Sequence, residues 1–392
     1  MRISVLLPYK ENYSPTYPGA VSLFVNSTNI YSKYKNDVVI YGSTNFKKKL
    51  SKNYINIALE KSFFRSQTKD YVNSFYKLQK KKIPDIIEIH NRPIYVNILT
   101  KLNTKIVLYF HNDPITMSGS KNTSERIHLL NVCSKIIFNS EWSKKQFLKN
   151  LSSFYYKSEK LIVIRQSINK TKINFSQKQK IITFVGKLNI SKGYDIFGKA
   201  IIRILDKYPQ WKAIVIGDEQ REKLFFEHKN LDNLGFQSHK KVLETFAKSS
   251  IAVACSRWEE PFGRTSLEAA SRGCAVIISN RGGLPETITN GIILRSLSVS
   301  NLFLSIEQLI NNKKKLLSMQ NESIDSKIGL NAKPLESFSP ININNDVYKS
   351  TPLSSPVMKL HRQLAKPPLP LKNSLNGKFR GTNGDIFLDA LL

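Results

Sequence analysis

The chain has 392 residues, with a hydrophobic fraction of 41% and an aromatic fraction of 10%. That is enough apolar surface to exclude a wholly disordered polymer, and the length favours two domains of ordinary size over one. Lys and Arg number 60 against 29 Asp and Glu, which gives a formal net charge of +31. This charge favours anionic partners such as nucleic acid, membrane surfaces or phosphorylated substrates, although AT-rich coding would also produce part of it.

Short runs of β-branched residues alternate with helical patterns in both halves of the chain, which is typical of parallel sheets with crossover helices. In the first half, strands are predicted at 3–8, 37–42, 86–90, 105–111, 135–140 and 162–165. In the second half, they are predicted at 181–186, 212–218, 251–256 and 275–280. The sequence therefore predicts an α/β protein made of two doubly wound, Rossmann-like halves.

A polar stretch without periodicity, near residues 168–178, separates the two halves. We expect an N-terminal domain over residues 1–170 and a C-terminal domain over residues 171–326. Residues 327–392 are rich in Pro, Ser and Asn and predict an irregular tail. A cleft between two such domains is a preferred ligand site, because loops at the carboxyl ends of parallel strands converge there.

The three cysteines lie in apolar stretches without the paired spacing of a metal or redox motif. They indicate small buried side chains in a reducing compartment. The apolar run at the N-terminus is too short for a signal peptide, and no segment approaches the ~20 apolar residues of a membrane span. We therefore expect a cytoplasmic protein, with peripheral association with the inner membrane face as an option.

Two lysines follow the first predicted strand of the second half. Lys187 and Lys192 lie in a loop before a helix that begins near Tyr194, where apolar residues recur at helical spacing. Compact positive charge in such a loop suits a diphosphate, which gains charge as it leaves. Lysines in loops are nevertheless more often merely solvated.

The segment WEEPFGRTSLEA, residues 258–269, carries two glutamates eight positions apart. Glu260 precedes a helix predicted over residues 263–272, and Glu268 lies about a turn and a half inside it. The helix N-terminus and the Gly-Gly pair at 282–283 offer backbone N–H groups to a diphosphate. The carboxylates can accept hydrogen bonds from ligand hydroxyls at two depths of one groove, unless both have only local roles.

In the order and spacing of these motifs, residues 181–295 resemble the donor-binding domain of the family-four retaining glycosyltransferases of the GT-B fold. The matching pieces are FVGKLNISKG, EPFGRTSLEA with its Glu-x7-Glu spacing, RGCAVIIS and GGLPE. The resemblance implies two Rossmann-like domains facing a cleft, with residues 1–170 on the acceptor side and residues 171–326 binding the nucleotide-sugar donor. It also implies transfer of a sugar from a nucleotide diphosphate sugar to a hydroxyl, with retention of configuration, in cell-surface glycan or lipopolysaccharide biosynthesis.

The resemblance implies roles for individual residues of the second half. Glu260 would contact the transferred sugar as a catalytic residue, and Glu268 would hold the ribose hydroxyls. Lys192 would neutralise the diphosphate, helped by Lys187, where the family more often has Arg. The backbone of three further residues would line the same pocket: Phe262, Gly263 and Arg264.

Two places in the first half also match. His111, just after a predicted strand, stands where such enzymes keep a histidine near the donor sugar, and we expect it to be catalytic. Gly19 and Ala20 stand at the usual Gly-Gly loop of the family, with the Ala20 methyl group at a point of close backbone approach to the donor.

The chain has no Asp-x-Asp triplet, the motif by which metal-dependent transferases hold Mg²⁺ or Mn²⁺. We therefore expect no metal cofactor, with lysines and helix N-termini facing the diphosphate instead. The expected partners are a nucleotide-sugar donor, a glycan or lipid-linked acceptor and an anionic membrane surface, without specific nucleic acid. Three alternatives stay open: a catalytically silent GT-B-like binding subunit, a basic nucleic-acid-binding α/β protein and a sugar-nucleotide epimerase.

Overall fold

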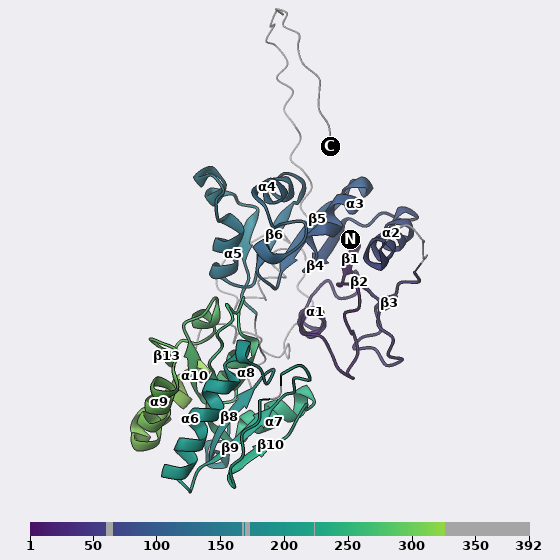
Figure 1. Ribbon diagram of the computed structural model, residues 1–392. Coiled ribbons are helices and arrows are strands. Elements are labelled where there is room, and N and C mark those ends of the chain that lie inside the picture. The colour runs from purple at the N-terminus through teal and green to yellow at the C-terminus, as the bar shows by residue number, and fades with distance from the viewer. Residues whose placement is uncertain (60–65, 167, 169–172, 223, 326–392) are drawn as a thin grey trace, which may run out of the picture.

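The structure is a computed structural model, and it describes residues 1–59, 66–166, 168, 173–222 and 224–325. The irregular tail expected over 327–392 lies outside these residues. The described chain forms two lobes, each built on a parallel β-sheet (Figure 1). The first lobe contains the described residues up to 166, and the second contains those from 173 to 325.

The sheet of the first lobe has the strand order β3-β2-β1-β4-β5-β6-β7, and neighbouring strands are parallel. Its strands are β1 (Ile3–Leu6), β2 (Val38–Gly42), β3 (Tyr54–Asn56), β4 (Ile86–His90), β5 (Lys105–Phe110), β6 (Lys135–Phe138) and β7 (Leu161–Val163). Its α-helices are α1 (Ala20–Ile30), α2 (Gln67–Lys80), α3 (Val96–Leu99), α4 (Thr123–Val132) and α5 (Glu141–Leu148).

The sheet of the second lobe has the strand order β10-β9-β8-β11-β12-β13, again parallel. Its strands are β8 (Gln179–Val185), β9 (Lys212–Ile216), β10 (Leu231–Asn233), β11 (Ser249–Ala254), β12 (Ala275–Ser279) and β13 (Ile292–Leu294). Its α-helices are α6 (Tyr194–Lys207), α7 (His239–Lys248), α8 (Arg264–Ser271), α9 (Val299–Asn311) and α10 (Lys313–Asp325).

Each sheet has apolar side chains on both faces. Helices can therefore pack on both faces, as in a doubly wound fold. In β4, Ile86 packs into one core of the first lobe, whereas Ile87 and Ile89 pack into the core on the opposite face. In β12, Ile277 and Ile278 divide in the same way between the two cores of the second lobe. Successive side chains of a strand point to opposite faces, so a continuous apolar run indicates a sheet buried between helices.

All the predicted strands are present, and α6 begins at Tyr194 as predicted. The apolar residues predicted to form its inner face are all buried: Ile196, Phe197, Ala200, Ile201, Ile204 and Leu205. Three strands were missed, namely β3, β10 and β13. Each has three residues, lies at a sheet edge and is only partly buried, so it lacks the apolar run that marks an inner strand.

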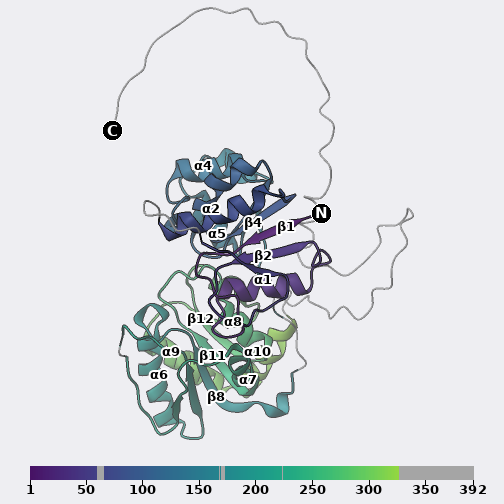
Figure 2. The ribbon, with the colours of Figure 1, turned by 90° about the vertical axis from the view of Figure 1, so that its right-hand side faces the viewer.

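The carboxyl edges of the two sheets face one another across the boundary between the lobes. Residues that follow β1, β5 and β6 line one cavity together with residues that follow β8 and β11. Helix α1 lies at this boundary, above α8 in the view of Figure 2. No helix in the described part of the chain is long and apolar enough to cross a lipid bilayer.

Candidate functional site

A cavity of about 230 Å³ lies between the two carboxyl edges. Open α/β sheets bind ligands at this edge, because the loops that follow the strands are free to vary there. The residues predicted from sequence that line the cavity are Ala20, His111, Lys192, Glu260, Phe262, Gly263 and Arg264. The structure thus brings together side chains from segments more than 200 positions apart.

Lys192 and Glu260 pair with each other at the mouth of this cavity. The ammonium group of Lys192 donates a hydrogen bond to Oε1 of Glu260, and their side chains are 33% and 15% exposed. The carbonyl oxygen of Ser191 accepts hydrogen bonds from the backbone N–H groups of Arg257 and Trp258, at 2.9 and 3.0 Å. The loop after β8 is thereby tied to the loop after β11, and this holds the two charged groups in contact.

Glu268 lies behind Arg264 and does not line the cavity. Its Oε1 accepts hydrogen bonds from Arg264 Nε at 2.7 Å and from His239 Nε2 at 2.9 Å. Burial alone would raise the pKa of this carboxyl. The hydrogen bond from His239 and the charge of Arg264 outweigh burial and hold the pKa below its usual value. Glu268 is therefore an ionised, buried anchor for a cavity-lining arginine.

Lys187 and Gly19 also lie outside the cavity lining. Lys187 is exposed, one position after the lining residue Gly186. At Gly19, an added Cβ would lie 1.9 Å from Oε1 of Glu11, whose carboxylate accepts a hydrogen bond from the N–H of Ser22 at 3.0 Å. In this arrangement the carboxylate of Glu11 occupies the N-terminal end of α1.

The expectation that the Gly-Gly pair at 282–283 offers free N–H groups to a diphosphate is wrong. The N–H of Gly282 donates to Oε2 of Glu259, and that of Gly283 donates to the carbonyl oxygen of Glu260, both at 2.6 Å. These hydrogen bonds fix the turn at 259–261 instead. The glycines are needed because this backbone approach is close: an added Cβ on Gly282 would lie 2.1 Å from that same carbonyl oxygen.

We expect Gly282→Ala to destabilise the protein far more than Gly235→Ala. Both glycines have left-handed backbones, with φ of +57° and +62°. That conformation costs an L-residue about 1–2 kcal/mol. At Gly235 nothing lies within 4 Å of an added Cβ, so the backbone conformation is the whole cost of the substitution there. At Gly282 an added Cβ would also clash with the backbone of Glu260. The measurement is the free energy of unfolding in urea, and equal losses for the two variants would contradict the packing at 259–261.

His111 is held by partners on both ring nitrogens. Its Nε2 lies 3.0 Å from Nδ1 of His90, and its Nδ1 lies 3.5 Å from the side-chain amide nitrogen of Gln166. Because an amide nitrogen can only donate, these partners assign the proton of His111 to Nε2. The N–H of His111 donates to Oδ1 of Asn91 at 3.2 Å, and its carbonyl oxygen accepts from Asn139 at 3.0 Å. The ring is therefore fixed in position and tautomer.

Burial lowers the pKa of His111 well below its usual value, and the neighbouring His90 and Arg264 lower it further. The unfolded chain takes up a proton at this residue near pH 6.5, whereas the folded protein resists it. Stability conferred by neutral His111 is thus fully present above pH 6.5 and is lost as the pH falls below that value.

We therefore expect the free energy of unfolding to fall by about 1.4 kcal/mol per pH unit below pH 6.5 on account of His111 alone. Urea denaturation at several pH values measures this slope. His111→Asn should remove that part of the slope, whereas the matched change His128→Asn should leave it, because His128 is exposed on α4. A slope unaltered in the His111 variant would show that its protonation is not suppressed by folding.

Several residues of the site were missed by the sequence analysis. Four of them surround His111: His90, Asn91, Asn139 and Gln166. A signal was available for these, because each lies at or just after the carboxyl end of a predicted strand next to, or near, the strand that ends before His111. For His239 there was no signal, since it begins α7 and meets Glu268 only through the packing of two helices.

Comparison with known proteins agrees with this geometry. Residues 165–325 match the sequence model of the glycosyl transferases group 1. This part of the chain is a group 1 glycosyl transferase domain. The chain is also 22% identical over 324 residues to a putative glycosyltransferase of Bacillus subtilis, YtcC, with 73% of this chain and 77% of that protein aligned.

The described chain has the GT-B fold, with two Rossmann-like lobes, as the sequence predicted. The structure of Anabaena HepE in complex with UDP-glucose superposes with a TM-score of 0.65 at 17% identity, covering 84% of this chain and 96% of that one. WaaG, a glycosyltransferase involved in lipopolysaccharide biosynthesis, superposes with a TM-score of 0.58 at 13% identity, covering 83% and 96%. At these identities the likeness concerns the fold.

Proposed function

We propose that this glycosyl transferase moves a sugar from a UDP-sugar to a hydroxyl group of a cell-surface glycan or its lipid-linked precursor, with retention of the anomeric configuration. The observation that carries the proposal is the cavity itself. There the ammonium group of Lys192, the guanidinium of Arg264, the N-terminus of α8 and the carboxylate of Glu260, all from the second lobe, meet His111 of the first lobe. Cationic groups suit a diphosphate, and the carboxylate and the imidazole suit sugar hydroxyls.

Binding of the donor would exchange the partners of Lys192. In the structure, its ammonium group is paired with Glu260. A diphosphate carries more charge than one carboxylate, so it would draw the ammonium group away and leave Glu260 to accept hydrogen bonds from hydroxyls of the transferred sugar. From the first lobe, His111 would exchange the long contact of its Nδ1 with Gln166 for a hydrogen bond from a hydroxyl of the same sugar, while Arg264 and the α8 N-terminus would face the phosphates.

Retention is supported by the side chains available in the cavity. Among the described residues that line it, Glu260 is the only carboxylate, and donor binding would commit it to hydroxyl groups of the sugar. A double displacement needs a free carboxylate as nucleophile on the far face of the sugar, and direct inversion needs one there as general base. We therefore assign attack of the acceptor to the same face as the departing phosphate, with the phosphate oxygen taking the acceptor proton.

Charge neutralisation by protein groups would make a metal ion unnecessary. Developing negative charge on the leaving diphosphate is stabilised by preorganised cations and helix N-termini as well as by metal ions. In the described part of the chain no group of three or more His, Cys, Asp or Glu side chains is placed to hold a metal. We propose metal-independent transfer. We also propose that Glu268, which lies directly behind Arg264, holds the ribose hydroxyls of the donor.

Uridine as the donor base is proposed from HepE, whose structures hold UDP and UDP-glucose. The experiment is incubation with UDP-, GDP- and ADP-sugars, with proton NMR of the sugar first released to water before it mutarotates. We expect turnover of an α-linked UDP-sugar with the α-anomer released, unaffected by EDTA. Initial release of the β-anomer would contradict retention, and activity abolished by EDTA would contradict metal independence.

An anionic membrane surface is the proposed docking partner of the first lobe. Phe154 and Tyr156 are 81% and 51% exposed, beside the exposed Lys149 and Lys157. Each basic residue near an anionic surface contributes about 1 kcal/mol of attraction, and the aromatic rings suit the headgroup layer. Co-sedimentation with phosphatidylglycerol vesicles, weakened by Phe154→Ser and absent with phosphatidylcholine, is the expected result. Equal binding to both lipids would contradict it.

A further inference from the structure

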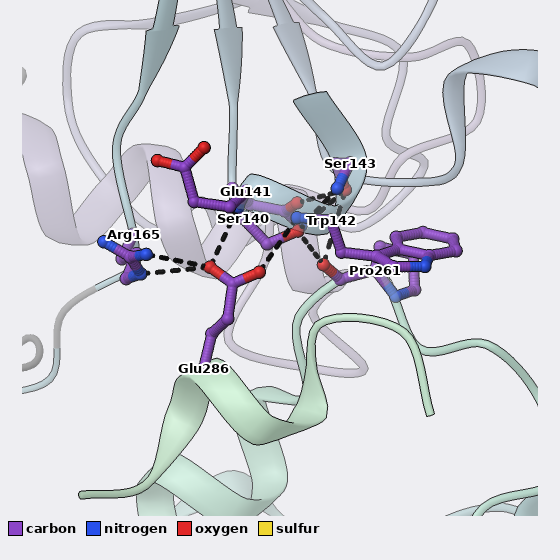
Figure 3. Close-up of polar contacts among 8 residues, drawn as sticks. Ser140, Glu141, Trp142, Ser143, Arg165, Pro261 and Glu286 are labelled. Carbon is purple, nitrogen blue, oxygen red and sulfur yellow. Dashed lines mark hydrogen bonds and ion pairs between the residues drawn. The ribbon is translucent and has the colours of Figure 1, made fainter. Parts of the chain in front are cut away.

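The carboxylate of Glu286 reaches across the boundary between the lobes and caps a helix of the other lobe (Figure 3). Glu286 lies in the short 3₁₀ helix Leu284–Thr287 of the second lobe. Its Oε2 accepts a hydrogen bond from the N–H of Glu141, and its Oε1 accepts one from the N–H of Trp142, both at 2.9 Å. These are the first two N–H groups of α5, which have no partner inside their own helix.

Arg165 of the first lobe completes the contact. It follows β7, and its Nε and Nη2 lie 3.1 and 3.0 Å from Oε2 of Glu286. One carboxylate from the second lobe is thus held by a guanidinium and by the positive end of a helix, both from the first lobe. Charge-assisted hydrogen bonds of this kind are stronger than those between neutral groups, and a helix N-terminus adds to the attraction for a carboxylate.

A second contact joins the lobes beside the first. The hydroxyl of Ser140, the residue that caps α5, donates to the carbonyl oxygen of Pro261 at 2.5 Å. Pro261 directly follows Glu260, and Gly283 packs against the same serine, where an added Cβ would lie 3.0 Å from Ser140 Oγ. The N-terminus of α5 therefore rests on the two loops of the second lobe that carry Glu260 and Glu286.

These contacts lie beside the cavity and not in its lining. Neither Glu286, Arg165, Glu141 nor Trp142 lines it. The first lobe nevertheless places Asn139, which supports His111, one residue before Ser140. A shift of α5 against the loops of the second lobe would therefore move His111 relative to Glu260 and Lys192.

We propose that Glu286 is a positioning residue. Together with Arg165 and the N–H groups of Glu141 and Trp142 it forms an interlobe clasp that sets the orientation of the two lobes and thereby the spacing of His111 and Glu260. The catalytic consequence rests on the proposed function. The structural consequence, a fixed arrangement of the lobes, does not, and it is measured separately.

The structural test measures the distance between the lobes directly. Spin labels are placed at His128→Cys on α4 and Lys199→Cys on α6, both exposed positions in different lobes, since the native cysteines Cys133, Cys255 and Cys274 are buried. Pulsed electron resonance then gives the distribution of label separations in the full chain. We expect one narrow distribution in the parent and a broader, shifted one with Glu286→Ala. A distribution unchanged in that variant would overturn the proposal.

Glu307→Ala is the matched control. Glu307 is exposed to the same extent as Glu286, 17% against 18%, and its ion pair with Lys207 at 2.7 Å lies wholly within the second lobe. We expect the label separation to be unchanged in this variant even if stability falls. Arg165→Ala should broaden the distribution, and adding it to Glu286→Ala should have little further effect, because both remove the same clasp. Full additivity would show that the two residues act separately.

The catalytic test separates positioning from ligand binding. We expect Glu286→Ala to lower kcat on the order of 10²-fold while the Kd for UDP stays within about twofold, because misplacement of reacting groups costs rate more than binding. An opened distribution with unchanged kcat would overturn the positioning role. A parent protein without transferase activity would count against the proposed function only, since the label measurement does not depend on turnover.

Discussion

Lys192→Ala lowers the transfer rate by about 10²–10³-fold in our account, because it removes the cation that faces the leaving diphosphate. The side chain lines the cavity, where it pairs with Glu260. Steady-state kinetics with the UDP-sugar measures the effect. Lys192→Arg keeps the positive charge and should recover much of the rate.

Lys187→Ala is the comparison for that experiment. Lys187 lies in the same loop, five positions earlier, but it is exposed and does not line the cavity. Both variants lose one positive charge from one loop, so a general electrostatic effect would lower the two rates alike. We expect less than about a threefold loss for Lys187→Ala, since exposed charges are largely screened. Losses of equal size would contradict a specific role for Lys192.

Glu268→Ala should destabilise the fold by about 3 kcal/mol, because it leaves the cation of Arg264 and the ring of His239 without their buried carboxylate. The measurement is the free energy of unfolding in urea at pH 7. Because folding lowers the pKa of Glu268, its contribution is present above about pH 4.5 and is lost as the pH falls through the folded pKa.

Glu268→Gln is the better variant for testing the ribose role. Glutamine keeps the size of the side chain and an oxygen that can accept from Arg264, so it should cost less stability than alanine. The double variant Arg264→Ala and Glu268→Ala should be less destabilised than the sum of the single changes, since neither partner is left unpaired. Simple additivity would show that the two side chains are not coupled. Unaltered nucleotide affinity in Glu268→Gln would contradict the ribose role.

Much of the fold could be predicted from sequence because its signals are local. The apolar spacing from Ile196 to Leu205 determines which face of α6 is buried, and the β-branched runs mark the inner strands. The short edge strands, such as β3, gave no such signal because the half-exposed residues of an edge need no continuous apolar run.

The residues of the site were predictable, but their pairings were not. Lys192 and Glu260 could each be found from a motif, and both line the cavity. That they neutralise each other depends on two loops separated by 68 residues meeting at one sheet edge. Glu268 was assigned to a ligand by resemblance. Its contact with Arg264 is an i,i+4 pair within α8, whereas its contact with His239 depends on how α7 packs against α8.

The interlobe clasp could not be predicted from the sequence. Glu286 belongs to the GGLPE motif, which was quoted as a match without a role for this glutamate. Its partners are backbone N–H groups of α5, which every helix has, and Arg165 beyond β7. Such a contact depends on the relative orientation of the two lobes. The apolar spacing within the helices and strands of either lobe does not predict that orientation.

The most direct test of the account is calorimetric titration of the full chain with UDP, UDP-glucose, GDP-mannose and ADP-glucose. We predict saturable binding of one uridine nucleotide per chain, weakened tenfold or more, about 1.4 kcal/mol, by Lys192→Ala and unaltered by Lys187→Ala. Failure of every nucleotide to bind, together with tight binding of nucleic acid that falls steeply with salt, would contradict a donor site between the lobes.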